Sequence, residues 1–296
     1  MANLKEIRNR IASVSSTMQI TSAMKMVSAA KLRRAQTAVQ QIRPYADKQN
    51  EMLRNILSNL GGNANTTFGV ERHLNEACVV VITSNRGLAG AFNTNVIKAA
   101  IAVIEGKYAE ARQNGKLTIL CIGKKGYDVL RKRYADCKII ADYVEIFHDL
   151  SFENVAQVSQ RLMHSFELGE LDAVTVAYGH FKNAATQFAL AEQWLPVAKL
   201  ESTDNSKTKA DYIFEPDMKS LLETLVPSIL QTTFHKYLLD THASEHGARM
   251  TAMDKATENA NELLKDLKLT YNKARQEAIT GEILEIVGGA AALESA

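Results

Sequence analysis

One short segment has the residue types and the spacing of a zinc hydrolase. His242, Glu245 and His246 match the HxxEH pattern, and on a helix the two histidines would lie one turn apart on the same face. There they could share a zinc ion, with Glu245 as the general base. However, His246 falls on an apolar helical seam, and only about 50 residues follow it to supply a third ligand. We therefore predict no metal site.

Two glycine-containing segments are candidates for nucleotide binding. Residues 86–90, RGLAG, follow an apolar run and precede a helical pattern, where phosphate-binding loops occur. Their glycine spacing is not GxGxxG, and no Gly-Lys-Ser/Thr follows, so the segment is not a P-loop. Residues 123–126, GKKG, fail the same test. Both segments are interpreted as turns, and we predict no nucleotide and no other cofactor.

The cysteines also give no reactive site. Cys78, Cys121 and Cys137 are far apart and show neither a CxxC pair nor metal-ligand spacing. This pattern indicates reduced, buried thiols in a cytoplasmic compartment. No Ser-His-Asp or Cys-His arrangement can be identified. Because the reactive residues do not indicate an enzyme, the function must be sought in the elements that carry them.

Charge placement is more informative than total charge. The chain has 35 basic and 33 acidic residues, a net charge of +2, which gives no reason to expect nucleic acid. Residues 1–34 nevertheless carry seven basic side chains and only one acidic residue, Glu6. Such a basic arm favours an acidic partner or an anionic membrane face. No apolar run approaches the roughly 20 residues of a membrane helix, so any link to a membrane must pass through a partner.

The N-terminal sequence has a long coiled-coil repeat. From Leu4 to Leu60, mostly apolar side chains recur at alternating steps of three and four residues. This repeat is typical of a helix that packs along one face against a partner. We expect Pro44 to kink the helix or mark a joint, and Gly61-Gly62 to end it.

Three neighbouring positions interrupt this seam with polar residues: Thr21, Lys25 and Ser28. An apolar stripe lies one residue away from them. It consists of Ile20, Met24 and Val27. We therefore expect the seam to change face here, toward a second partner.

The C-terminal third repeats the pattern. Its seam comprises Leu239, Ala243, His246, Met250, Met253, Thr257, Ala260, Leu264, Leu267, Tyr271, Ala274 and Ala278. Pro216 and Asp217 are typical of a helix start, and no strong breaker occurs between Pro227 and Gly288-Gly289. One helix over 217–287 would be roughly 105 Å long, which exceeds the diameter of a compact domain.

Two heptad helices at opposite ends of one chain are expected to pair antiparallel, with the intervening segment folded separately. The sequence thus predicts an antiparallel coiled-coil shaft from residues 1–60 and 215–296 and a central domain over 75–200. The alternative is a helical bundle whose ends pack on the middle domain.

The middle of the chain alternates strands and helices, which predicts a Rossmann-like α/β domain with right-handed crossovers. Residues 77–83 form a continuous apolar run, typical of a buried parallel strand. Further strands are expected at 117–123, 137–141, 172–180 and 185–195, the last as an antiparallel edge, with helices from Thr94 to about 113, at 124–134 and at 152–167. The polar segment 201–210 is expected to be an exposed loop.

Three separate blocks resemble the gamma subunits of F-type ATP synthases. They are LKEIRNRIASVSSTMQITSAMKMVSAAKLRRAQ near the start, TSNRGLAGAFN in the middle and ARMTAMDKATENANELLKDLKLTYNKARQEAITGEILEIVGGAAAL at the end. The blocks occur in the family's order and spacing and cover about a third of the chain, whereas residues 105–215 match loosely.

The resemblance implies a non-catalytic rotary shaft. In the family the two terminal helices pass up the centre of a head of alpha and beta subunits, and the C-terminal tip turns in an apolar sleeve. The α/β domain contacts the epsilon subunit and the membrane c-ring, whose proton-driven rotation turns the shaft. ATP is made on beta, so no nucleotide is expected on this chain. The implied location is peripheral, at the cytoplasmic face of a bacterial inner membrane.

The resemblance also implies coupling residues. Met24 and Lys25 match the place where the shaft meets a mobile acidic segment of beta. Arg249 matches a family position implicated in coupling, and so does a group near the helix tip, which comprises Arg275, Gln276 and Thr280. Gly281 departs from the longer polar residue that relatives carry there. In a helix, glycine costs about 1 kcal/mol of propensity.

Two other functional classes stay open at this point. A static coiled-coil adaptor would explain the heptads and the basic arm, but not the three matched blocks or the apolar tip. A zinc peptidase ranks third, and the metal content of the purified chain would separate it from the other two.

Overall fold

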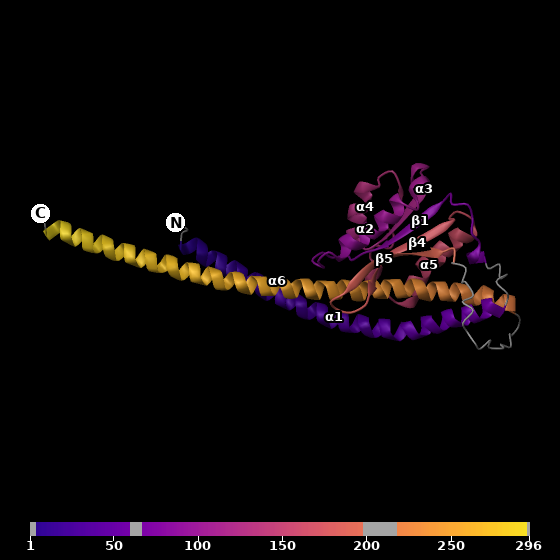
Figure 1. The fold of residues 1–296 in the computed structure, drawn as a ribbon, viewed down its shortest axis with the longest axis horizontal. Helices are drawn as coiled ribbons and strands as arrows, with labels where there is room; N and C mark the ends of the chain where they lie inside the picture. Colours follow the sequence, from indigo (N-terminus) through magenta and orange to yellow (C-terminus); the bar gives the residue numbers. More distant parts are fainter. Residues whose placement is uncertain (1–3, 60–66, 198–217, 295–296) are drawn as a thin grey trace. The chain divides into compact units, whose positions relative to one another are not determined.

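The computed structural model describes residues 4–59, 67–197 and 218–294. Two long helices lie at the two ends of the chain, α1 (Leu4–Asn59) and α6 (Met218–Glu294), and an α/β segment lies between them in sequence (Figure 1). The prediction of long terminal helices around a central α/β domain is confirmed. Within the described residues, no helix is long and apolar enough to cross a membrane.

The chain divides into two compact units. The helical unit comprises Met1–Ser28 and Met250–Ala296, and the globular unit comprises Ala29–Arg249. Because α1 and α6 each cross a unit boundary, both helices contribute to both units. Each unit is described by itself below.

The two helices run through residues that usually disrupt helices. Pro44 lies inside α1 and Pro227 inside α6. We expected Gly288-Gly289 to stop the second helix, but α6 continues to Glu294, so this prediction is wrong. Glycine costs only about 1 kcal/mol per residue in a helix, which a long helix tolerates. Other predicted boundaries lie outside the described residues, namely Gly61-Gly62, the loop 201–210 and the start at Pro216-Asp217.

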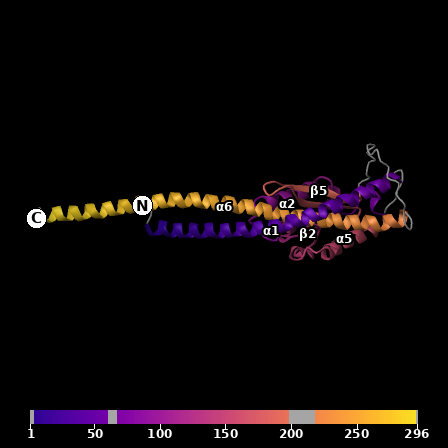
Figure 2. The same cartoon turned by 90° about the horizontal axis from the view of Figure 1, so that it is seen from below.

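In the helical unit, α1 and α6 pair antiparallel (Figure 2). The Nζ of Lys25 lies 2.5 Å from Oδ1 of Asp254, and the hydroxyl of Thr257 donates to that of Thr21 over 2.8 Å. Residue numbers therefore fall along α1 while they rise along α6. The antiparallel coiled coil predicted from the heptads is confirmed.

The expected change of face at the polar part of the α1 seam is wrong. Thr21 and Lys25 keep their contacts with α6, and Ser28 is only 3% exposed. The apolar neighbours Ile20 and Val27 are instead 57% and 58% exposed. The seam keeps its face because Thr21 and Lys25 have polar partners on α6. The Ser28 hydroxyl is instead satisfied within α1, where it donates to the carbonyl of Met24 over 2.8 Å.

Every predicted seam position of α6 is buried or half-buried. Beyond Ala278 the pattern changes, and α6 extends past the N-terminal end of α1 in both views (Figures 1 and 2). The large apolar side chains in this last stretch are 48–71% exposed. They are Ile279, Ile283, Leu284, Ile286 and Val287. Within the described residues, nothing covers this apolar tip.

The globular unit contains a five-stranded sheet with the order β3-β2-β1-β4-β5. Four strands are parallel, and β5 pairs antiparallel with β4 at the edge. This is the predicted Rossmann-like arrangement with its antiparallel edge. The strands are β1 (Ala77–Ile82), β2 (Leu117–Ile122), β3 (Lys138–Ile140), β4 (Ala173–Phe181) and β5 (Gln187–Leu195).

Helices cover both faces of this sheet (Figure 1). On one face lie α2 (Phe92–Glu105), α3 (Ala109–Gln113) and α4 (Lys124–Arg133); on the other lie α5 (Phe152–Glu167), the 3-10 turns η1 (Thr67–Gly69) and η2 (Ile146–His148), and α6. We expected one helix from Thr94 to about 113, but α2 begins at Phe92 after Ala91, and Gly106 separates α2 from α3.

The central strand shows why its sequence is a continuous apolar run. Side chains alternate between the faces of a strand, and both faces of β1 are covered. Val79 and Val81 pack with the α2 side, whereas Val80 and Ile82 pack with the α5 and α6 side, and all are fully buried. Phe234 of α6 is also fully buried against this second face.

Candidate functional site

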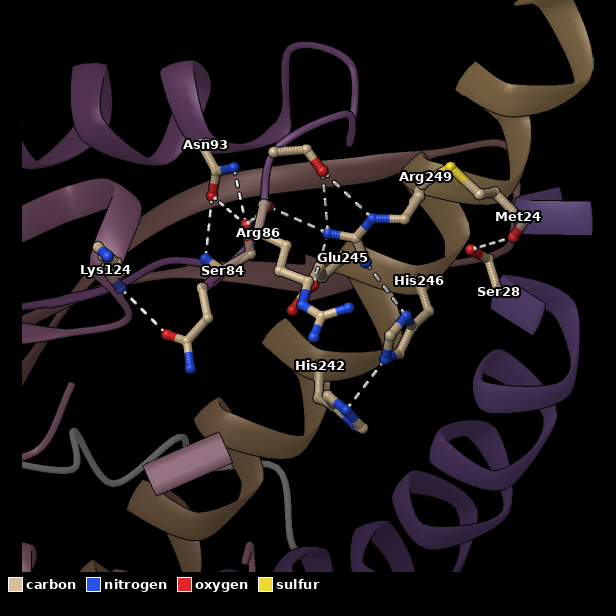
Figure 3. Close-up of polar contacts among 12 residues, drawn as sticks. Met24, Ser28, Ser84, Arg86, Asn93, Lys124, His242, Glu245, His246 and Arg249 are labelled. Carbon is tan, nitrogen blue, oxygen red and sulfur yellow. Dashed lines mark hydrogen bonds and ion pairs between the residues drawn. The ribbon is translucent and has the colours of Figure 1, made fainter. Parts of the chain in front are cut away.

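Among the predicted coupling residues, Arg249 alone lies in the globular unit. Its side chain is 9% exposed, and one guanidinium nitrogen lies 2.7 Å from a carboxylate oxygen of Glu245, one turn earlier on α6. The guanidinium also donates to the carbonyl of Arg86 over 3.1 Å and to that of Gly87 over 3.3 Å (Figure 3). Arg249 thus joins α6 to the loop between β1 and α2.

That loop is held in place from its other side as well. The backbone N–H of Ser84 donates to the side-chain oxygen of Asn93 over 2.9 Å, and the Ser84 hydroxyl donates to the carbonyl of Arg86 (Figure 3). Leu88 adopts φ 62°, which is unusual for a side chain larger than glycine, and is 63% exposed. The loop therefore presents carbonyl oxygens to Arg249 and an apolar side chain to solvent.

His246 and His242 continue the chain of contacts from Arg249. Arg249 lies 3.4 Å from Nδ1 of His246, and Nε2 of His246 lies 3.1 Å from Nε2 of His242 (Figure 3). Since arginine can only donate, His246 accepts at Nδ1 and donates from Nε2 to His242. Burial, aided by Arg249 and Lys31, lowers the pKa of His242 to about 4 and that of His246 to about 3. Both rings are therefore neutral at pH 7.

The zinc hypothesis fits this arrangement poorly. Glu245, its proposed general base, forms the ion pair with Arg249. Burial raises the pKa of Glu245, and Arg249 opposes this shift. Arg249 and Lys31 also place positive charge near the two histidines. Among the residues that the structure describes, no three His, Cys, Asp or Glu side chains are grouped to hold a metal ion.

Residues 86–90 lie in a loop, as predicted, but residues 124–126 form the first turn of α4, so the interpretation of GKKG as a turn is wrong. Polar groups of both segments already have partners within the chain. The carbonyls at 86 and 87 face a cation, which is the opposite of a phosphate-binding loop. At the start of α4, the N–H of Lys124 donates to Asn85 over 3.1 Å, and the N–H of Gly126 donates to Thr83 over 2.8 Å. Gly123 adopts φ 93°, and a Cβ there would lie 2.0 Å from the carbonyl oxygen of Thr83.

The other predicted coupling residues lie in the helical unit. Met24 is half-buried, and Lys25 forms the ion pair with Asp254. The group near the tip of α6 is exposed; it comprises Arg275, Gln276 and Thr280. The structure brings Lys25 together with α6 and leaves the tip group open to solvent. The roles of all these residues stay predictions.

One buried polar group of the globular unit was missed by the sequence analysis. Asp240 of α6 is fully buried and lies 3.1 Å from Arg43 of α1 and 3.2 Å from His180 of β4. Burial raises the pKa of Asp240, and Arg43 and His180 oppose the shift. The partners are 197 and 60 residues away in sequence, and no local spacing rule links such positions.

Comparisons with known proteins decide the family. The family model described as ATP synthase matches residues 3–293. The ATP synthase gamma chain of Cytophaga hutchinsonii is 53% identical over 100% of this chain and 100% of its own length. That of Flavobacterium psychrophilum is 54% identical over 99% of this chain and 100% of its own. The chain belongs to the ATP synthase gamma chain family. Gamma chains are rotor subunits of the central stalk, so this chain is not itself the catalytic subunit.

Solved structures agree with this fold. A chain in the cryo-EM structure of the Euglena gracilis mitochondrial ATP synthase rotor, in rotational state 1, is 25% identical, with a TM-score of 0.56 over 93% of this chain and 98% of that chain. A chain in the OSCP/F1/c-ring structure of the same enzyme, in rotational state 3, shares the fold at 23% identity. Its TM-score is 0.62, over 99% of this chain and 95% of that chain. A static adaptor is not favoured for a gamma chain.

Proposed function

We propose that this gamma chain is the shaft that couples proton flow through a membrane ring to ATP synthesis on a head of alpha and beta subunits. In this proposal residues 1–60 and 215–296 form the shaft, and residues 75–200 form the domain that joins it to the ring and to an epsilon subunit. The complex lies at the cytoplasmic face of a bacterial inner membrane, and this chain contacts the membrane only through its partners.

The observation that carries the proposal is the apolar tip of α6. Side chains pointing in different directions around the helix are exposed there, from Ile279 at 48% to Ile286 at 71%. A helix with a wide apolar face normally packs that face against a partner, and exposed apolar surface marks an interaction site. An apolar sleeve formed by alpha and beta subunits would enclose the tip without fixing its rotational angle, since apolar contacts are not directional.

The coupling residues extend the proposal to individual side chains. Met24 and Lys25 would meet an acidic segment of beta, and the exposed group near the tip would contact the head; it comprises Arg275, Gln276 and Thr280. Arg249 would act differently, since it is buried and holds α6 to the β1–α2 loop. We therefore expect Arg249 to transmit motion within this chain.

Reconstitution with alpha and beta subunits and the remaining subunits in membrane vesicles tests the proposal. The intact chain should join the head, support ATP hydrolysis and couple it to proton pumping. A chain truncated after Lys273 lacks the tip and should lower the number of protons pumped per ATP hydrolysed. Leu284→Ala is the finer variant, because it removes one exposed apolar side chain of the tip. The proposal is wrong if the intact chain neither joins the head nor changes its activity.

A further inference from the structure

A charged junction around the buried carboxylate of Asp240 ties three elements of the globular unit together; the side chains of Arg43 and His180 are 36% and 34% exposed. The carboxylate of Asp240 on α6 accepts from Arg43 on α1 over 3.1 Å and from Nδ1 of His180 on β4 over 3.2 Å. The same Arg43 nitrogen donates to the carbonyl of Phe181 over 2.8 Å. We call Arg43, His180 and Asp240 the Asp240 junction. It joins both shaft helices to the sheet at one point.

Neighbouring contacts extend this junction along the same side of α6. The N–H of Gly179 donates to the Thr241 hydroxyl over 3.2 Å, and the Ser244 hydroxyl donates to the Gly179 carbonyl over 3.0 Å. One turn before Asp240, the hydroxyl of Tyr237 donates to Glu192 of β5 over 3.1 Å. Positions three and four residues apart share a helix face, so α6 presents a row of buried polar groups to the sheet.

The type of contact matters for a shaft. Hydrogen bonds weaken steeply when their angle changes, whereas apolar contacts are not directional. A helix held only by apolar packing can turn slightly about its axis at small cost. A helix held by buried, charge-assisted hydrogen bonds cannot turn without leaving a buried carboxylate unpaired, which is strongly unfavourable.

We propose that the Asp240 junction is the torque-bearing joint of this gamma chain, at which rotation of the sheet is passed to both helices of the shaft. The inference rests on the proposed function. Asp240 is a positioning residue: it touches no substrate, and it acts by fixing the angle between α6, α1 and β4. A joint of this kind matters most when the shaft works against an opposing force.

The test compares loaded and unloaded turnover in the reconstituted complex. Asp240→Asn removes the charge that pairs with Arg43 while nearly keeping the shape of the side chain. ATP hydrolysis should stay near the wild-type rate without a proton gradient, but fall at least about twofold relative to wild type when a gradient opposes pumping. Loss of a charge-assisted hydrogen bond should also speed hydrogen exchange in β4 near Gly179 about tenfold or more.

Asp136→Asn is the matched control. It makes the same chemical change in the same unit, but the carboxylate of Asp136 is 52% exposed, whereas that of Asp240 is fully buried. This variant should keep the wild-type ratio of loaded to unloaded turnover. If Asp240→Asn prevents assembly, Thr241→Val removes only the hydroxyl that accepts from Gly179 and should produce a smaller fall in the same ratio.

The outcomes separate the junction from the proposed function. If the wild-type complex pumps protons but the junction variants have the same ratio of loaded to unloaded turnover as Asp136→Asn, the proposal about the junction is wrong and the proposed function stands. A wild-type chain that neither assembles nor supports pumping would overturn the proposed function and the junction with it. A variant that loses loaded and unloaded turnover equally is merely destabilised, which also counts against the junction.

Discussion

Lys25 of α1 and Asp254 of α6, which are 229 residues apart in sequence, form an ion pair between the two long helices. Their side chains are 42% and 58% exposed, so water screens the pair. Lys25→Ala should therefore lower the free energy of unfolding by less than about 1 kcal/mol. Denaturant unfolding of Lys25→Ala, Asp254→Ala and the double variant measures the coupling between the two residues.

A functional assay then separates the two roles of Lys25. If Lys25 also contacts an acidic partner, Lys25→Ala should reduce coupling in the reconstituted complex more than Asp254→Ala does. Lys268→Ala, at an exposed position of α6, is the control. Equal effects of the two single variants would contradict the partner contact.

The histidine pair predicts how stability depends on pH. The pKa values of His242 and His246 fall from 6.5 to about 4 and about 3 on folding. Above pH 6.5 both histidines are neutral in the folded and in the unfolded chain, so they do not change the free energy of unfolding. As the pH falls below 6.5, only the unfolded chain gains these protons, so stability should decline by up to about 1.4 kcal/mol per pH unit for each histidine.

A variant isolates this effect from other titrating groups. Glu245 and Asp240 have raised pKa values and give the opposite slope in acid. The useful quantity is therefore the difference in melting temperature between wild type and His242→Gln/His246→Gln, followed from pH 7.5 to pH 5. The melting temperature of the variant should fall less steeply below pH 6.5 than that of the wild type. Parallel curves would show that the histidines are not buried as described.

Gly179 is expected to tolerate no side chain. A Cβ at this position would lie 2.4 Å from a ring carbon of Phe92 and 3.3 Å from Cβ of Ser244. Gly179→Ala should lower the free energy of unfolding by about 1–3 kcal/mol, the usual cost of overpacking. Adding Phe92→Leu should recover part of this loss, since it removes the ring. Strictly additive losses in denaturant unfolding would contradict this explanation.

Replacing Gly281 should have the opposite effect on stability. Nothing lies within 4 Å of a Cβ at this position of α6. Gly281→Ala should therefore stabilise the helix locally by about 0.5–1 kcal/mol. Slower amide hydrogen exchange on both sides of residue 281 would show the gain. Gly288→Ala, which is equally open, should behave alike, and unchanged exchange in both variants would show that propensity does not limit order at the tip.

The seam positions were predictable because apolar repetition is a local signal. Leu32, Val39, Leu264 and Leu267 occupy heptad positions and are all less than 10% exposed. The polar positions of the α1 seam were misinterpreted because a heptad pattern is read on each helix alone and does not show the residues that face it on the partner helix. Only the structure shows that Thr21 faces Thr257.

Local rules also misplaced the start of α2. Thr94 has the preferred chemistry of an N-cap, yet the helix begins at Phe92 after Ala91. The side-chain oxygen of Asn93, in the first turn of α2, accepts a hydrogen bond from the backbone N–H of Ser84. This contact ties the start of the helix to the end of β1. The Asp240 junction was missed for a related reason, because its partners meet only when the fold brings three distant elements together.

The pairing of α1 with α6 also sets an order of events during synthesis. Lys25 leaves the ribosome 229 residues before its partner Asp254. At bacterial or eukaryotic elongation rates this delay is about 10–50 s, far longer than helix formation requires. Throughout that interval the nascent N-terminal helix lacks the partner for its apolar face, and one face of the sheet lacks the cover that α6 residues such as Phe234 give it. We expect the newborn chain to depend on chaperones that shield its first helix until the last one emerges.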